Sequence, residues 1–261
     1  MNRKRLIIFG ATAGAGLVLL GILGAASYVA GQRKAAAFSL KPTTAAATVA
    51  PSVAPRSLQA ACPAPSSNQR GGELWVAGAG TQAGFRAHEV FMDIRLPHEA
   101  VARTDSVAGQ MLMRRVDGSH VAIQNGCFAV ELNTLTSVDT LPGMDAHDRD
   151  QFYPDALETR QHPFAVLALD HATIPIFGSR PQHLTLSGEL TIKGTTQPVS
   201  ITVDAQTVGG GVQAVGSMAI DARDFSVHVP GEGDSPVAVD PHLTLEFLLV
   251  LSALPAAGQA D

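Results

Sequence analysis

Cationic residues are scarce over most of this 261-residue chain. Eight of the 18 Lys and Arg residues, and none of the 23 Asp and Glu residues, lie in residues 1–70. Residues 71–261 therefore carry a formal net charge of −13, with Lys193 as their one lysine. Such an acidic domain repels phosphate backbones, which excludes nucleic acid as its partner.

Sequence motifs typical of metal and catalytic sites are missing. The nine histidines form no HxH or HxxxH pair, and no GxSxG turn presents a nucleophile. The glycines of "GAGTQAG" are not followed by the Lys-Ser/Thr of a phosphate-binding loop. We therefore predict no catalytic residue, no metal and no cofactor, and the chain is not expected to be an enzyme.

Only two cysteines occur, Cys62 and Cys127. The stretch "LQAAC" resembles a lipoprotein cleavage box, but its leucine is one position too far from the cysteine, which excludes lipidation. Outside the cytoplasm a pair of cysteines suggests one disulfide. The alternative is two unrelated thiols.

The one long apolar run, Leu6 to Ala30, holds 25 residues without a charge. As a helix it would reach about 37 Å, enough to cross a bilayer with some tilt. Basic residues within 1–5 precede it, and the balance of flanking charge favours a cytoplasmic N-terminus. We expect a single-pass anchor in the cell membrane, with the rest of the chain extracytoplasmic. The alternative is a signal peptide cleaved at "AAS" or "YVA", although its apolar region would be unusually long.

The composition of residues 31–261 predicts a linker, a folded domain and a tail. Residues 31–70 are rich in Ala, Pro, Ser and Thr and predict a disordered linker. Residues 71–253 are expected to form the folded domain, and residues 254–261 a flexible tail.

Alternation of apolar and polar residues dominates the folded part. In "FAVEL", Phe128, Val130 and Leu132 share one face, and "HLTLSGELTIKG", "VSITVDA" and "HLTLEFLLVL" repeat the pattern. This period of two predicts antiparallel strands with one face in an apolar interior. Turn signals separate the runs, and "KGTTQP" predicts a hairpin.

Helical patterns are few. "LPHEAVAR" predicts one or two helical turns, and "MDAHDRDQFYPDALETR" predicts one or two short helices interrupted by Pro154. Many short strands without a βαβ rhythm indicate an all-β barrel or sandwich. The pattern leaves open whether the interior is packed solid or holds a ligand.

The ordered set "GELWVAGAGTQAGFRAHE", "SVAGQMLM", "CFAVELNTLTSVDT", "HDRDQFYP", "HPFAVLAL" and "LTLSGELTIKGTTQPVSITVDA" resembles the YceI-like family of polyisoprenoid-binding proteins. The resemblance implies an extended, lipocalin-like antiparallel barrel of about eight strands with an apolar pore. It also implies a bound long-chain lipid, such as a polyisoprenoid or a quinone-type tail. The family often has phenylalanine where Leu167 stands and histidine where Glu89 stands, next to His88.

Applied to this sequence, the resemblance and the alternation predict a set of pocket-lining residues: Trp75, Phe85, Phe128, Val130, Leu132, Ala165, Leu167, Leu169, Leu184, Leu186, Gly188, Leu190, Ile192, Leu243, Leu245 and Phe247. The small residues Ala165 and Gly188 are expected to mark free space in the bore.

The charged stretch "HDRD" is interpreted as architecture. Asp145 or Asp148 can cap a short helix, and Arg149 can hold loop carbonyls or carboxylates through its fork of donors. In the family this arginine and the following aspartate recur in the loop over the barrel mouth. Ser137, Arg149 and Asp150 are therefore expected to brace a lid, with Asp150 paired to an arginine elsewhere.

Two functions remain open from the sequence. The first is a membrane-anchored extracytoplasmic protein that shelters a long apolar lipid. The second is a packed barrel that serves as a structural or interaction module of the cell envelope, with protein partners unknown.

Overall fold

The computed structural model describes residues 35–40, 56–63, 72–91, 96–141, 145–231 and 236–254. The expected membrane anchor at residues 6–30, with its basic N-terminus at 1–5, lies outside these described residues. Within the described ranges, none of the helices combines the length and the apolar composition that crossing a bilayer requires.

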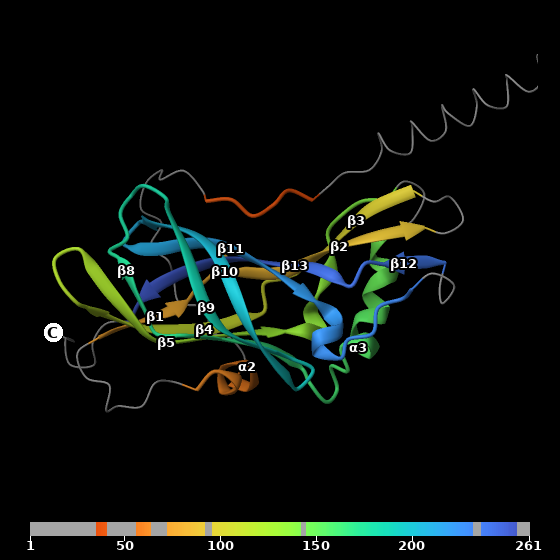
Figure 1. The fold of residues 1–261 in the computed structure, drawn as a ribbon, viewed down its shortest axis with the longest axis horizontal. Helices are drawn as coiled ribbons and strands as arrows, with labels where there is room; N and C mark the ends of the chain where they lie inside the picture. Colours follow the sequence, from red (N-terminus) through yellow and green to blue (C-terminus); the bar gives the residue numbers. More distant parts are fainter. Residues whose placement is uncertain are drawn as a thin grey trace, which may run out of the picture.

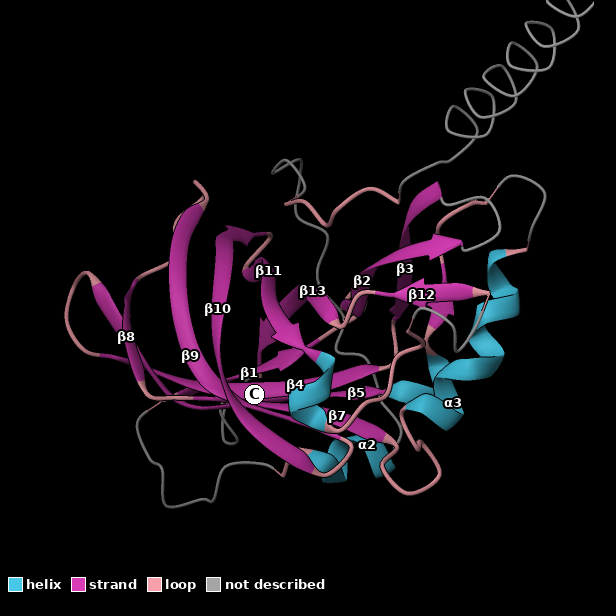
Figure 2. Cartoon of the chain, turned by 45° about the vertical axis from the view of Figure 1, so that its right-hand side comes forward, coloured by secondary structure: helices cyan, strands magenta, loops and turns pink. Residues whose placement is uncertain are grey.

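Strands make up most of the described chain (Figures 1 and 2). The strands are β1 (Glu73–Ala77), β2 (Gln82–Phe91), β3 (Leu96–Thr104), β4 (Val107–Arg115), β5 (His120–Glu131), β6 (Thr136–Ser137), β7 (Phe164–Leu169), β8 (Ala172–Pro175), β9 (Gln182–Ile192), β10 (Thr195–Val208), β11 (Gly211–Asp221), β12 (Val237–Val239) and β13 (His242–Ala253). The helices are α2 (Arg56–Ala61) and α3 (Tyr153–Ala156), with the 3-10 helices η1 (Leu132–Thr134), η2 (Ala146–Phe152) and η3 (Ala222–Phe225).

Eight strands close into an antiparallel barrel. Their order is β1-β4-β5-β7-β9-β10-β11-β13, and β13 pairs back onto β1. The barrel is elongated because β13 is long enough to pair with β1 near its C-terminal end and with β2 nearer its start. The strands β2, β3 and β6 thus continue the wall beyond β1, towards η2 and α3 (Figure 1). The predicted all-β barrel is confirmed.

The prediction of helical turns in "LPHEAVAR" is wrong. These residues form β3, which pairs with β2 from Ala83↔Thr104 to Phe91↔Leu96. Ala and Glu favour a helix locally, but nine consecutive strand pairs and the burial of His98, Ala100 and Ala102 outweigh that preference.

The hairpin predicted at "KGTTQP" is confirmed. β9 ends at Ile192 and β10 begins at Thr195, which leaves Lys193 and Gly194 as a two-residue turn. Both turn residues have positive φ, 52° and 74°, as the turn that matches strand twist requires. The short helices predicted around Pro154 are also present, and Pro154 lies in the first turn of α3 rather than interrupting a longer helix.

Two parts of the expected linker, 31–70, instead lie against the barrel, on opposite sides of it (Figure 1). The first is residues 35–40. Arg86 donates a hydrogen bond to the Ala35 carbonyl and Arg103 one to the Ala36 carbonyl, at 3.0 and 2.5 Å. The Phe38 ring lies 4.1 Å from the Arg103 guanidinium carbon, within the range of a cation–π contact.

The second is α2, which packs on the outer face of β4 and β5. Leu58 is fully buried there against Ala108 and Ala129. Cys62 forms a disulfide with Cys127, with their Cα atoms 5.5 Å apart. A six-residue helix with one buried leucine is too short to show a helical period, so composition alone assigned it to a linker.

Candidate ligand-binding site

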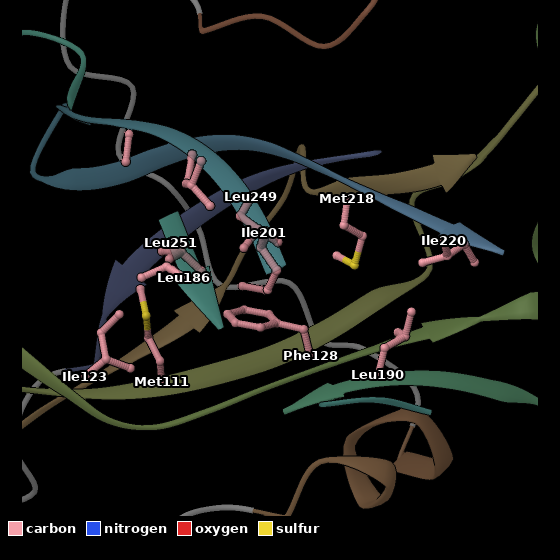
Figure 3. Packing of buried hydrophobic residues seen from close by; sticks show 14 of the residues in the cluster. Met111, Ile123, Phe128, Leu186, Leu190, Ile201, Met218, Ile220, Leu249 and Leu251 are labelled. Carbon is pink, nitrogen blue, oxygen red and sulfur yellow. The ribbon is translucent and has the colours of Figure 1, made fainter. Parts of the chain in front are cut away.

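The inward faces of all eight barrel strands converge on one apolar cluster. Residues two apart along each strand point to the same side, so Leu186 and Leu190 on β9 both face the interior. Leu186 lies near Leu249 and Leu251 of β13, and Leu190 lies further along the bore (Figure 3). Phe128 on β5 lies between them. The cluster is the core of the barrel.

A cavity of about 80 Å³ lies within this cluster. Its walls are apolar throughout: Met111, Ile123, Phe128, Leu167, Leu169, Ile174, Phe177, Leu184, Leu186, Ile201, Val203, Ala205, Val212, Ala214, Phe247, Leu249 and Leu251. Pockets for small-molecule ligands usually measure roughly 300–1,000 Å³. Side chains therefore fill most of the bore in this structure.

The filling is incomplete. Leu167, Leu169, Leu184 and Phe247 line the cavity and point inward, yet each is only partly buried. Because these side chains point inward, their exposed atoms face space inside the barrel or at one of its openings. Met111 and Met218 also face this interior, and the unbranched methionine side chain adapts readily to a changed cavity.

Six of the predicted lining residues border the cavity: Phe128, Leu167, Leu169, Leu184, Leu186 and Phe247. Others belong to the same cluster without bordering it: Trp75, Leu190, Ile192, Leu243 and Leu245. Phe85, Leu132 and Ala165 pack together at the end of the barrel near α3, and Val130 is partly exposed.

Sequence reasoning omitted β4, β8, β10 and β11 from the site, although all four contribute to the cavity wall. A signal was present, because Ile201 and Val203 alternate with polar residues as clearly as the residues of β9 do.

Gly188 does not mark free space in the bore, contrary to the prediction. A Cβ placed on it would lie 2.3 Å from the Ala168 carbonyl oxygen on β7. The glycine instead permits a close approach of two backbones. Any larger residue there would collide with the neighbouring strand rather than enter the cavity.

The end of the barrel near η2 and α3 is plugged. Phe85 and Tyr153 pack edge to face with ring centroids 5.6 Å apart, and Leu132, Leu135 and Leu157 surround them. This lid-end plug separates the cavity from the loop that carries η2.

Above the plug, Arg149 braces the loop through two buried carboxylates. Its Nη1 donates to Glu89 Oε1 at 2.8 Å and its Nη2 to Asp139 Oδ2 at 2.5 Å. His98 Nε2 lies 2.7 Å from the same Asp139 oxygen. The side chains of Glu89, His98 and Asp139 are at most 3% exposed. These four residues form a lid brace that joins η2 to β2 and β3.

Ser137 and Asp150 complete the attachment. Asp150 Oδ1 accepts a hydrogen bond from the Ser137 backbone N–H at 2.9 Å, and its Oδ2 lies 3.0 Å from His147 Nδ1. We expected Asp150 to pair with an arginine elsewhere in the chain, but its partners among the described residues are the Ser137 N–H and His147. Asp145 caps η2, since its side chain accepts from the His147 N–H.

Sequence reasoning missed His98 and Asp139. His98 stands in no motif, and Asp139 lies in the quoted stretch "CFAVELNTLTSVDT" but was given no role there. The two meet each other, and Asp139 meets Arg149, only through the pairing of β3 with β2 and β6 and the fold of η2. Among the residues that the structure describes, no three His, Cys, Asp or Glu side chains are placed to hold a metal ion.

Burial raises the pKa values of the two carboxyl groups in the lid brace, whereas pairing with cations and hydrogen-bond donors lowers them. Burial raises the pKa of Glu89, and this outweighs the attraction of Arg149. Burial would also raise the pKa of Asp139, but hydrogen bonds from His98, Arg149 and the Val101 N–H hold that pKa well below its ordinary value of 3.8.

The low pKa of Asp139 predicts a loss of stability in acid. Below about pH 4 this carboxyl is protonated in the unfolded chain but stays ionised in the folded chain. The unfolded state therefore binds more protons, and the free energy of unfolding falls as the pH falls.

We expect Asp139→Asn to be less stable than the wild-type chain at pH 7 and to lose less stability between about pH 4 and 2. Urea unfolding at a series of pH values measures this. Asp105→Asn, in the exposed turn after β3, is the control, and an unchanged acid slope in Asp139→Asn would contradict the prediction.

Comparison with solved structures finds distant similarities at low sequence identity. A polyisoprenoid-binding domain from Saccharophagus degradans aligns with a TM-score of 0.47 and 13% identity, over 69% of this chain and 98% of that one. BcnA from Burkholderia cenocepacia aligns with a TM-score of 0.45 and 19% identity, over 66% and 96% of the two chains. Comparison with curated proteins gives no match.

Comparison with protein families supplies the relationship. The YceI-like domain matches residues 77–251, from the last residue of β1 to the C-terminal part of β13. The match covers the barrel from the end of β1 to most of β13, with its lid-end plug and the lid brace. It confirms the resemblance drawn from the sequence, and this chain is a member of the YceI-like family.

Proposed function

We propose that the barrel binds a single long apolar chain, a polyisoprenoid or quinone-type tail, along its bore. The observation that carries this proposal is the wholly apolar wall of the cavity, with partly exposed Leu167, Leu169, Leu184 and Phe247 pointing into it. Each CH₂ group removed from water contributes about 0.8 kcal/mol, so a long tail needs few polar anchors. Membership of the YceI-like family supports the same ligand class.

The cavity of about 80 Å³ sets a condition on this binding. A polyisoprenoid is much larger, so side chains must move as the ligand enters. The adaptable Met111 and the partly exposed Phe177 lie on the cavity wall and can change rotamer without breaking backbone pairs. Apolar contacts to the ligand would replace those that the side chains make with one another.

The small cavity also favours a second candidate function. A bore filled by its own side chains suits a structural or interaction module of the cell envelope that binds no lipid. The two candidates differ in one measurable property, the presence of an apolar ligand in the purified protein.

We further propose that residues 6–30 anchor the chain in the cell membrane and leave the barrel extracytoplasmic. The uncharged 25-residue run and its basic flanks support this. A disulfide between Cys62 and Cys127 suits an oxidising compartment outside the cytoplasm.

Native mass spectrometry of the full chain, purified in detergent and stripped of it in the gas phase, tests these proposals. We expect the 27.1 kDa chain with one additional apolar mass, identified after solvent extraction. A chain that begins near Ser27 or Gly31 would contradict the anchor. A chain without bound lipid would favour the structural module.

A pair of variants locates the ligand. Ala214 lies on the cavity wall, whereas Ala168 is exposed on the outer face of β7. Ala214→Leu should fill the cavity and lower the fraction of ligand-bound chain at least fivefold, and Ala168→Leu should leave it unchanged. Equal ligand content in both folded variants would place the lipid outside the bore.

A further inference from the structure

The barrel wall divides between β10 and β11. These strands pair from Val208↔Gly211 to Thr202↔Ser217, where their pairing ends. Beyond that point, residues 195–201 of β10 follow β9, and residues 218–221 of β11 follow β13. Figures 1 and 2 show β9 and β10 turning away from β11 and β13 towards the hairpin at Lys193 and Gly194.

A hollow of about 740 Å³ occupies this division. We call it the side hollow. Its rim is polar and includes Ser200 and Thr202 on β10, Ser217 on β11 and Thr244 on β13. It is much larger than the cavity in the bore and lies within the size range of ligand pockets.

The floor of the side hollow belongs to the barrel interior. Val199, Met218, Ile220 and Phe225 line it, and all four are members of the interior apolar cluster or pack against it. Met218 and Ile220 point into that cluster in Figure 3. Only this layer of side chains therefore separates the hollow from the bore.

Three residues on one face of β11 lead from the cavity to the side hollow. Ala214 lines the cavity, Met218 lines the hollow, and Gly216 lies between them on the same face. The Phe247 ring lies across Gly216, where a Cβ would be 2.2 Å from its Cζ atom. Rotation of Phe247 and Met218 would connect the two spaces without breaking a strand pair, because Gly216 has no side chain to obstruct it.

The wide end of the side hollow is held by two hydrogen bonds. Gln197 Nε2 donates to the Asp224 carbonyl of η3 at 3.0 Å, and Lys193 Nζ donates to the Ser226 carbonyl at 2.9 Å. They tie the β9–β10 hairpin to η3 and fix the width of the hollow. At the η2 end of the barrel, by contrast, the lid-end plug and the lid brace stand between solvent and the bore.

We propose that the side hollow is a lateral entrance through which an apolar chain passes into the bore. This inference rests on the proposed lipid-binding function. The polar rim leaves a head group in water while the tail crosses the floor at Met218 and Phe247. A lateral entrance also lets a tail slide in sideways, without threading its whole length through an end of the barrel.

A single introduced cysteine tests the entrance in the full chain. Ala219 is exposed on the rim of the side hollow. The two native cysteines are joined in a disulfide, so the thiol introduced by Ala219→Cys is the one that a polyethylene glycol maleimide can label. The probe is NBD-labelled geranylgeraniol in donor vesicles, and quenching of Trp75 reports its uptake. We expect uptake at least tenfold slower in labelled than in unlabelled Ala219→Cys.

Two matched cysteines control for the label. Thr173 is exposed on β8, none of whose residues lines the side hollow, and Val116 is 52% exposed at the β4–β5 turn, at the opposite end of the barrel from α3. Labelling either should leave the rate unchanged. A slower rate only with the label at position 116 would show entry through that end and overturn the lateral entrance, and so would equal rates at all three positions.

Gln197→Ala removes one of the two hydrogen bonds and should speed uptake at least threefold, because the hollow can widen. An unchanged or slower rate would count against the entrance. The experiment also distinguishes a wrong entrance from a wrong function. No uptake by the unlabelled chain would refute lipid binding altogether, whereas normal uptake without an effect at position 219 would refute only the entrance.

Discussion

Replacement of Arg149 by methionine should lower the free energy of unfolding by about 3–5 kcal/mol, the usual cost of breaking a buried ion pair from one side. Methionine occupies a similar volume but leaves Glu89 and Asp139 without their shared cation. Their side chains are 3% and 0% exposed, so water cannot replace the lost hydrogen bonds. Urea unfolding followed by the fluorescence of Trp75, the single tryptophan of the chain, measures the loss.

A surface arginine provides the matched control. Arg223 pairs with Asp221 at 2.5 Å, but its side chain is 65% exposed, so Arg223→Met should change stability little. The double variant Arg149→Met, Glu89→Gln should recover part of the loss, since one uncompensated carboxylate is removed. If Arg149→Met is no less stable than Arg223→Met, Arg149 does not brace the lid.

Loss of the disulfide should destabilise the domain by about 4 kcal/mol in the chain-entropy model, given the sequence separation of 65 between Cys62 and Cys127. Reduction also frees α2, and six residues are too few to remain helical alone. We expect the double variant Cys62→Ser, Cys127→Ser to unfold at lower urea and to exchange the amide protons of residues 58–62 rapidly.

Reductant gives an independent measurement of the same effect. The wild-type chain should lose stability in dithiothreitol, whereas the double serine variant should not respond to it. A wild-type chain whose urea midpoint is the same with and without reductant would contradict a stabilising role for this bond.

The sequence by itself determined which way most strand residues point. A strand side chain has only two directions, so alternation placed Phe128, Leu186 and Phe247 inside the barrel before any pairing was known. The turn at Lys193 and Gly194 was predictable for a similar reason, because it lies between two strongly alternating runs.

Other features depended on contacts between residues distant in the sequence. The helix-like "LPHEAVAR" became β3 because β2 pairs along its whole length. Gly188 meets the backbone of β7, and Arg149 meets Glu89, 60 residues away. No local pattern encodes these partners, since each depends on strand order and register.

Only the tertiary structure decided how completely side chains fill the bore and where the wall around it is thinnest. The volume of the cavity depends on the rotamers of side chains from eight strands at once, and the side hollow depends on where β10 and β11 stop pairing. The period of two is the same on both sides of Thr202, so it could not indicate that end. Alternation sets the direction of each side chain within a strand, but the distance between strands is set by packing over the whole barrel.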